Sequence, residues 1–430
     1  MNGYQLTGLL LTIVAGFGYL NRRILKLPDI VGITAVAMAM SIALMVAARF
    51  HAMPLLDEAQ DFVRQMNFDS LVFDGMLGLL LFAGALHVDV SAMKEQKWPI
   101  VMLSTFGVLL SMVIAGYGMY AAMHLFGAKI DLLWCMAFGA LISPTDPVVV
   151  LSILKTVGLP KSLEDKITGE ALFNDGVAVV AFTTLVGMAS GSESYASVSA
   201  VVHLLAHEVL LALVLGLLFG FLGTRMVNRV DSHAVEIFIT LSMATAGYSL
   251  AVSLGASGPL TAVVMGLVVG SHGFNFCVSE KSRERLFDFW SLVDELLNFI
   301  LFGLVGLMVL TIDIGAAHIA VGAVAILIVL FARYVSVGIP LGFFRSGPVS
   351  TRARAKILTW GGLRGGISIA LALSLPAFAG RGYVQAATYI VVAFGLMVQA
   401  TTLNRLVTHW LHGKSAQMAP AKREPAFTEE

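Results

Sequence analysis

Long apolar runs fill almost the whole sequence, and they constrain its fold more than any other feature. A helix needs about 20 mostly apolar residues to cross the hydrocarbon core of a bilayer. Because helices and closed barrels alone satisfy their backbone groups in lipid, we predict an all-α polytopic membrane protein with about 13 transmembrane helices. The predicted spans are residues 5–21, 28–48, 69–89, 99–123, 132–154, 166–189, 198–224, 234–254, 259–273, 286–310, 314–343, 355–378 and 384–408.

The composition supports this class and excludes others. Of the 430 residues, 58% are hydrophobic and 13% are charged, which is about half the charged fraction of a soluble domain. The formal net charge is zero, so nothing favours a nucleic-acid partner. Cys135 and Cys277 are the two cysteines, and they provide neither a disulfide framework nor the spacing of a zinc site. We therefore expect no cofactor.

Basic residues between the spans lie almost entirely on one side of the predicted membrane. Of the 27 lysines and arginines, all but six lie in the odd-numbered connections or the C-terminal tail. Cytoplasmic connections carry an excess of Lys and Arg, so we predict the N-terminus outside and the C-terminus in the cytoplasm of a plasma (inner) membrane protein. Arg333 and Arg364 lie inside spans, where they are natural counter-ions for acids. The other four exceptions are Arg49, Arg64, Lys129 and Arg381.

The fifth predicted span is interrupted at its centre by two prolines. The string SPTDP at 143–147 places Thr145 and Asp146 between Pro144 and Pro147. Proline has no backbone N–H and breaks the hydrogen-bond ladder of a helix. Carbonyls freed at membrane depth are tolerated where they line a cavity or are buried in protein, and many transporters build cation sites from them. The alternative is a simple proline kink.

The sixth predicted span carries two acids and an amide. Glu170 and Asn174 are four residues apart and share one helix face, whereas Asp175 lies about 100° around from Asn174. An acid at membrane depth is costly and is a functional candidate by default. The two intramembrane arginines are too few to pair with every acid in the fifth and sixth spans. A fixed ion pair is credible for Glu170, and Asp175 is the better candidate for a free acid.

The twelfth predicted span contains GGLRGG at 361–366. Glycine pairs on both sides of Arg364 indicate either a second interruption or a close helix crossing. This span follows the fifth by seven, and an odd offset reverses the direction of the chain through the membrane. We therefore predict inverted repeats, with two interrupted helices that cross near the midplane.

Five short strings follow one another along the chain. They are LFAGALHVD at 81–89, SPTDP at 143–147, GEALFNDG at 169–176, NFILF at 298–302 and GLRG at 362–365. Together they resemble the NhaP-type sodium/proton antiporters of the monovalent cation:proton antiporter family. The resemblance covers essentially the whole chain.

This resemblance implies an architecture. Residues 1–410 would form a transmembrane antiporter domain, and residues 411–430 a short cytoplasmic tail. The domain would combine a dimerisation part with a six-helix transport bundle around spans 132–189 and 314–408. The protein would act as a homodimer.

The resemblance also implies roles for individual residues. Asp175 would carry the cation or the proton, with Asn174 beside it, and Thr145 and Asp146 of the interrupted helix would complete the Na⁺ ligands. Glu170 would form a structural ion pair with Arg333. Supporting roles would fall to Pro144, Pro147 and Arg364.

Two positions depart from the family pattern. Ala171 lies one turn before Asp175, where the family commonly has serine, so a hydroxyl ligand is missing. Ala83 stands where the family often has an acid, and Asp74 is a candidate to replace it. Water or the carbonyl of Thr145 are alternative ligands. Both departures weaken any transfer of ion selectivity from the family.

The predicted activity is the exchange of a monovalent cation for H⁺ by alternating access. An acid deprived of hydration holds either a proton or a hard cation, so competition at Asp175 would couple the two fluxes. We expect Na⁺, with Li⁺ or K⁺ as options, electroneutral 1:1 exchange and a role in pH homeostasis. The alternatives are a cation-coupled solute symporter and a K⁺-preferring K⁺/H⁺ antiporter. An enzyme is disfavoured, because the chain lacks the HExxH and GxSxG motifs.

Overall fold

The computed structural model describes residues 2–412, apart from residues 49, 51–52, 155–160, 193–197, 231, 273–279 and 344–349. Within these ranges the regular structure is helical, without a β-strand. Eleven helical segments of this described part are long and apolar enough to cross a membrane. The predicted all-α polytopic class is therefore confirmed. Most of the predicted tail, from residue 413 onward, lies outside the described residues.

Two further predicted spans are present in shorter form. The ninth corresponds to α15, Gly258–His272, a helix of 15 residues. The twelfth is divided into α18, Thr351–Trp360, and α19, Gly366–Leu373. Neither half of the twelfth span is long enough to cross a bilayer alone. The total of about 13 crossings stays a prediction.

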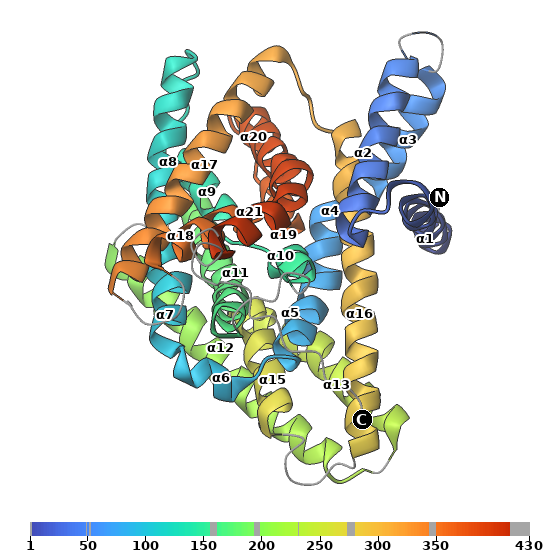
Figure 1. Ribbon diagram of the computed structural model, residues 1–430, viewed down its shortest axis with the longest axis vertical. Coiled ribbons are helices and arrows are strands. Elements are labelled where there is room, and N and C mark those ends of the chain that lie inside the picture. Colours follow the sequence, from blue (N-terminus) through green and yellow to red (C-terminus); the bar gives the residue numbers. More distant parts are fainter. Residues whose placement is uncertain are drawn as a thin grey trace, which may run out of the picture.

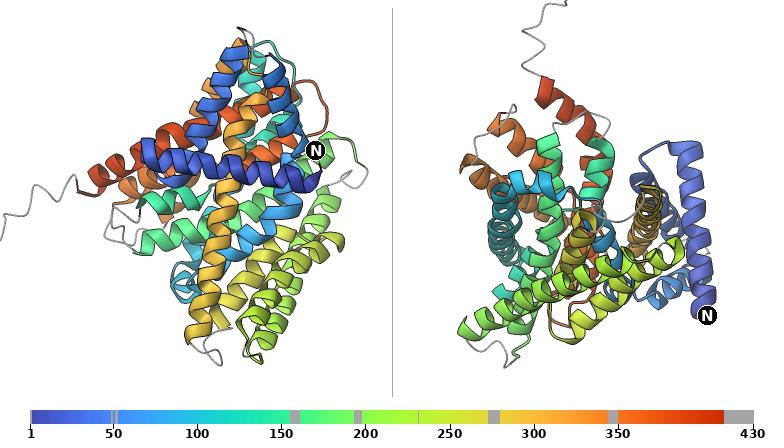
Figure 2. Two further views of the ribbon diagram at one scale, coloured as in Figure 1. Left: turned by 90° about the vertical axis from the view of Figure 1, so that its right-hand side faces the viewer. Right: turned by 90° about the horizontal axis from the view of Figure 1, so that it is seen from below.

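One group of helices, which we call the panel, comprises residues 3–86 and 198–310. α15 packs against both α5 and α12, and α16 packs against α2. In the left view of Figure 2, α1 lies across α16 at the molecular surface. The panel contains α1 (Gly3–Leu20), η1 (Asn21–Leu25), α2 (Asp29–Ala48), α3 (Met53–Gln65), α4 (Phe68–Ser70), η2 (Leu71–Met76), α5 (Leu77–Leu86), α12 (Val198–Val227), α13 (His233–Ser242), η5 (Met243–Gly247), α14 (Tyr248–Ser253), α15, α16 (Glu280–Leu307) and η6 (Met308–Leu310).

The second group, which we call the bundle, comprises residues 97–189 and 316–412. α8 packs against α9 and α17, α17 packs against α20, and α11 packs against α9. A short helix, α6 (Val90–Glu95), connects the panel to it. The bundle contains α7 (Lys97–Val101), η3 (Met102–Gly107), α8 (Val108–Leu125), α9 (Leu132–Ile142), α10 (Pro147–Leu154), α11 (Lys161–Ala189), α17 (Ala316–Phe343), α18, α19, α20 (Arg381–Phe394), η7 (Gly395–Gln399) and α21 (Ala400–His412).

Glycines allow two panel helices to approach until their backbones touch. A Cβ built at Gly266 of α15 would lie 2.6 Å from the carbonyl oxygen of Phe82 in α5. A Cβ at Gly270 would lie 2.3 Å from the carbonyl oxygen of Leu86. Small residues permit such crossings in membranes. No side chain larger than hydrogen fits at these two points of the panel.

Two helices of the bundle, α19 and α11, contact the panel. α19 contacts α4 and α16, and α11 contacts α15 and α5. Figure 1 shows α10, α11 and α19 in the middle of the molecule, with α16 along its right-hand side and α8 and α17 at the upper left. The border between panel and bundle therefore runs past the residues that the sequence singles out.

Candidate functional site

The interruption of the fifth span lies between α9 and α10. Ser143 ends α9, and Pro147 occupies the first position of α10, where its missing N–H is not needed. Asp146 precedes α10, and its Oδ1 accepts a hydrogen bond of 2.9 Å from the N–H of Val148. This is N-cap geometry, with a carboxylate at the positive end of a helix. The proline pair therefore produces a full interruption rather than a kink.

The second interruption, residues 361–365 between α18 and α19, crosses the first. The backbone N–H of Asp146 donates to the carbonyl oxygen of Leu363 at 2.8 Å, so the two interruptions are joined main chain to main chain. A Cβ built at Gly365 would lie 2.3 Å from Oδ2 of Asp146. The glycine pairs were predicted to mark either a second interruption or a close helix crossing. The structure has both, because the helix is interrupted and the crossing is close.

We expect Gly365→Ala to destabilise the protein. The added methyl group would displace the Asp146 carboxylate, and overpacking of this kind costs about 1–3 kcal/mol. The apparent melting temperature in detergent should fall. A suitable control is Gly84→Ala, since no atom lies within 4 Å of a Cβ built at Gly84. Equal melting temperatures for the two variants would contradict the close crossing.

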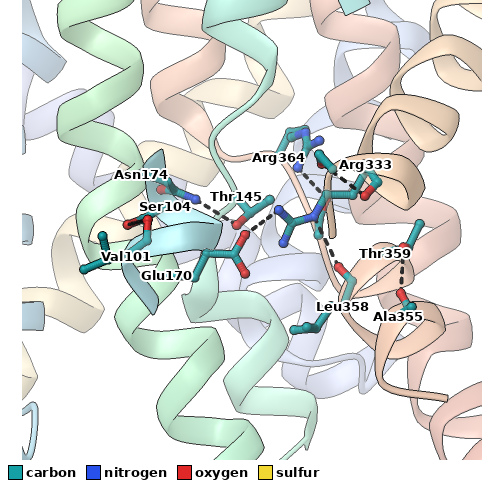
Figure 3. A network of polar contacts seen from close by, with 12 residues as sticks. Val101, Ser104, Thr145, Glu170, Asn174, Arg333, Ala355, Leu358, Thr359 and Arg364 are labelled. Carbon is teal, nitrogen blue, oxygen red and sulfur yellow. Dashed lines mark hydrogen bonds and ion pairs between the residues drawn. The ribbon is translucent and has the colours of Figure 1, made fainter. Parts of the chain in front are cut away.

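Asn174 of α11 reaches the first interruption. Its Nδ2 donates to Oγ1 of Thr145 at 3.0 Å, and both side chains are buried (Figure 3). Oδ1 of Asn174 is also buried and has no hydrogen-bond partner in the described part of the chain. An unsatisfied buried oxygen costs about 1–3 kcal/mol. Asn174 therefore fixes Thr145 and keeps one oxygen available for a cation or a water molecule.

Asp175 follows Asn174 on α11 and is 8% exposed. No hydrogen bond or ion pair joins its carboxylate to another described residue. The charge of Asp146 acts on it, and Asp146 is itself partly buried. The structure thus brings the two aspartates within electrostatic range of each other, one from each of two adjacent bundle segments.

Glu170 and Arg333 form a buried ion pair, with side chains 1% and 5% exposed (Figure 3). The Nε of Arg333 also donates to the carbonyl oxygen of Leu358 at 3.3 Å, in the last turn of α18. A cation near a helix C-terminus is favoured by the helix dipole. The pair therefore joins α11, α17 and α18 beside the crossing.

Arg364 is buried as well, but no carboxylate pairs with it among the described residues. Its guanidinium donates to the carbonyl oxygen of Gly362 at 2.9 Å, and its Nε has no partner within the described ranges. The charges of Arg333 and Glu170 act on it. At the crossing, Arg364 therefore forms no direct ion pair with the carboxylate of a described residue.

A cavity lies beside the crossing. Thr145, Asp146, Glu170 and Arg333 contribute to its lining. It is about the size of one water molecule. This space suits a small ion or water and gives no room to an organic solute.

One acid near the crossing, Asp294, was not predicted from the sequence. Asp294 lies in the middle of α16 because that helix begins at Glu280, before the predicted start of the span. Its charge acts on Asp146. The spacing of Asp294 and Asn298, one turn apart in an apolar helix, is the signal that could have identified it. Asp74, considered from the sequence, is exposed and acts instead on Tyr248 of the panel.

Two interrupted helices that cross beside buried acids are typical of membrane transporters, many of which bind their ions at such crossings. The family described as sodium/hydrogen exchanger, transmembrane, matches residues 9–409. The chain belongs to this family. The resemblance predicted from the five strings is therefore confirmed, and the protein is a transporter rather than an enzyme.

Individual relatives agree with this family. The chain is 39% identical over 397 residues to the Na⁺/H⁺ antiporter NhaP of Pseudomonas aeruginosa, covering 90% of this chain and 92% of the relative. It is 30% identical over 390 residues to the Na⁺/H⁺ antiporter NhaH of Halobacillus dabanensis, with the same coverage. The solved structure of the sodium proton antiporter MjNhaP1 from Methanocaldococcus jannaschii matches with a TM-score of 0.72 at 18% identity, covering 94% of this chain and 97% of that one. This last similarity concerns the fold.

Proposed function

We propose that the protein exchanges Na⁺ for H⁺ across the plasma (inner) membrane and so contributes to pH homeostasis. The named activities of its relatives support the reaction. The water-sized cavity at the crossing disfavours the alternative of a solute symporter. Cation and proton would compete for Asp175, with Asp146, Thr145 and Asn174 as the neighbouring oxygen groups.

The charge balance at the crossing is the observation that supports this proposal best. Three carboxylates and two guanidiniums meet there, so the fully ionised set has a net charge of one negative unit. One monovalent cation or one proton neutralises it. Electroneutral 1:1 exchange follows, since the site is equally neutral with either occupant. The five side chains are those of Asp146, Glu170, Asp175, Arg333 and Arg364.

The coupling of the cation flux to the proton flux would follow from the same charge balance at the crossing. An uncompensated charge is expensive to move through a region of low dielectric constant, so the empty site would not cross the membrane barrier. The bundle would move against the panel only when Asp175 holds a cation or a proton. Alternating access with either occupant is exchange, and no second pathway is needed.

The ion preference is tested by exchange in everted vesicles. Proton movement is followed with a pH-sensitive dye while Na⁺, Li⁺ and K⁺ are added in turn. We expect Na⁺ to give the largest response, with K⁺ as the rival because Ala171 supplies no hydroxyl oxygen. The rate should not change when a lipophilic ion collapses the membrane potential. A response to none of the three cations would contradict the proposed function.

Competition at one site predicts a specific pH dependence. Because the proton occupies the same carboxylate as the cation, the apparent KM for Na⁺ should rise as the pH falls. The rise should approach about tenfold per pH unit once most sites are protonated, as linkage requires for one competing proton. Exchange rates measured over a grid of Na⁺ concentrations and pH values check this. A KM that is independent of pH, with changes confined to the maximal rate, would exclude a shared site.

We also propose a membrane orientation and an oligomeric state for the protein. The charge pattern supports an outer N-terminus and a cytoplasmic C-terminus. The panel would serve as the dimerisation part of a homodimer, and the bundle as the transport part. Labelling of single cysteines from each side of intact cells, and the mass of the purified protein, test these two points.

A further inference from the structure

One face of α16 points toward the crossing. Leu301 lies on this face, because a Cβ built at Gly366 of α19 would come within 2.5 Å of its side chain. Asn298 and Asp294 lie one and two turns earlier on the same face, at the i, i+4, i+7 spacing of a helix stripe. Asn298 is buried and Asp294 is partly buried. The panel therefore presents a carboxylate about two turns from the crossing.

Few described groups stabilise the negative charge of Asp294. Nδ2 of Asn298 donates to its Oδ1 at 3.2 Å, and no Lys or Arg pairs with it in the described part of the chain. The basic group that acts on it is His87, the residue that follows α5. The ring of His87 is engaged elsewhere, at 2.7 Å from the carbonyl oxygen of Ala83 and 2.9 Å from Oγ of Ser291. The carboxylate therefore keeps acceptor capacity for a cation.

The charge of Asp294 acts across the border between panel and bundle. Asp146, the acid at the interruption, feels this charge. Two charged carboxylates within electrostatic range of each other at membrane depth repel, and a mobile cation near both would relieve the repulsion. Asp294 also lies on the side of the crossing toward the N-terminus of α16, which follows a connection that the charge pattern places in the cytoplasm.

We propose that Asp294 is a cation-docking residue on the cytoplasmic approach to the site. A monovalent cation is held there between the Asp294 carboxylate of the panel and the Asp146 carboxylate of the bundle before it reaches Asp175. The carboxylate of Asp294 stays with the panel, so it increases cation capture from one side only. This role rests on the proposed exchange at Asp175.

The test measures Na⁺/H⁺ exchange by Asp294→Asn in everted and right-side-out vesicles. In everted vesicles, where the cytoplasmic face meets the added Na⁺, we expect the apparent KM to rise about fivefold, as the loss of one nearby charge in a partly hydrated place implies. The maximal rate should stay within about twofold of the parent. Right-side-out vesicles should show no change in KM. Asp294→Glu should restore the parental KM, which a purely structural role would not predict.

A matched control is Asp288→Asn, which removes an exposed acid from the same helix. An unchanged KM for Asp294→Asn in everted vesicles, or an equal rise in the control, would overturn the proposal. So would a change seen only from the outer face, or a complete loss of exchange that Glu does not restore. These results differ from a failure of the proposed function, in which the parental protein itself would show no Na⁺-dependent proton movement.

Discussion

Asp175→Asn should abolish cation/proton exchange while the protein remains folded. The substitution preserves the shape of a buried side chain but removes the one acid of the crossing that no described residue compensates. It also makes the crossing neutral without any transported ion, since two carboxylates and two guanidiniums remain. Neither a cation nor a proton is then required for movement, and neither is bound.

Dye-based exchange assays in everted vesicles check this prediction. We expect the signal of the variant to fall to that of vesicles without the protein, at equal expression and with a melting temperature close to that of the parent. Na⁺ should no longer stabilise the variant against heat, because a ligand stabilises only the state that binds it. Asp131→Asn, an exposed acid at the start of α9, is the control. Normal pH-dependent Na⁺ exchange by Asp175→Asn would refute the assignment.

Glu170→Gln and Arg333→Gln should each destabilise the protein by about 3–5 kcal/mol, because each leaves an uncompensated buried charge. The effect is expected to be among the largest of any single substitution outside the apolar core. The loss of Arg333 also leaves the Leu358 carbonyl without its donor. Apparent melting temperatures of the purified variants in one detergent measure the order of stability.

The double substitution Glu170→Gln with Arg333→Gln gives the sharper test. Two amides can hydrogen-bond to each other, so the pair should recover part of the stability that either single change removes. Asp29→Asn provides a surface control, since its partner Arg22 is 71% exposed, and exposed pairs contribute about 0–1 kcal/mol. Additive effects of the two buried substitutions would show that the pair is not coupled.

The sequence predicts the interruptions of the fold because their causes are local. Proline lacks an N–H wherever it stands, and paired glycines permit close crossings regardless of their surroundings. The number of crossings is harder to predict. α15 has only 15 residues and the twelfth span is divided, so neither fits a rule based on a continuous apolar length. Helix starts are also hard to predict: α16 begins at Glu280, six residues before the predicted start of its span, and this places Asp294 in the middle of the helix.

The candidate site also has some features that can be predicted from the sequence and others that cannot. Counting three acids against two intramembrane arginines shows without any coordinates that one acid stays unpaired, and the family resemblance pairs Glu170 with Arg333. The pairing of Asn174 with Thr145 and the link between Asp146 and Leu363 depend on contacts between segments 29 and more than 200 residues apart. No local pattern encodes such contacts. They arise only once the two groups of helices have packed.

The link between Asp146 and Leu363 uses an N–H and a carbonyl group, not side chains. Every residue except proline supplies the N–H, and every residue supplies the carbonyl. The link between the two interrupted helices therefore needs no particular side-chain chemistry, only the room that Gly365 leaves beside Asp146. Residues beside the crossing, such as Ala171, can therefore be replaced without breaking this main-chain link. Side chains that set an ion preference could thus differ between proteins that share this main-chain link.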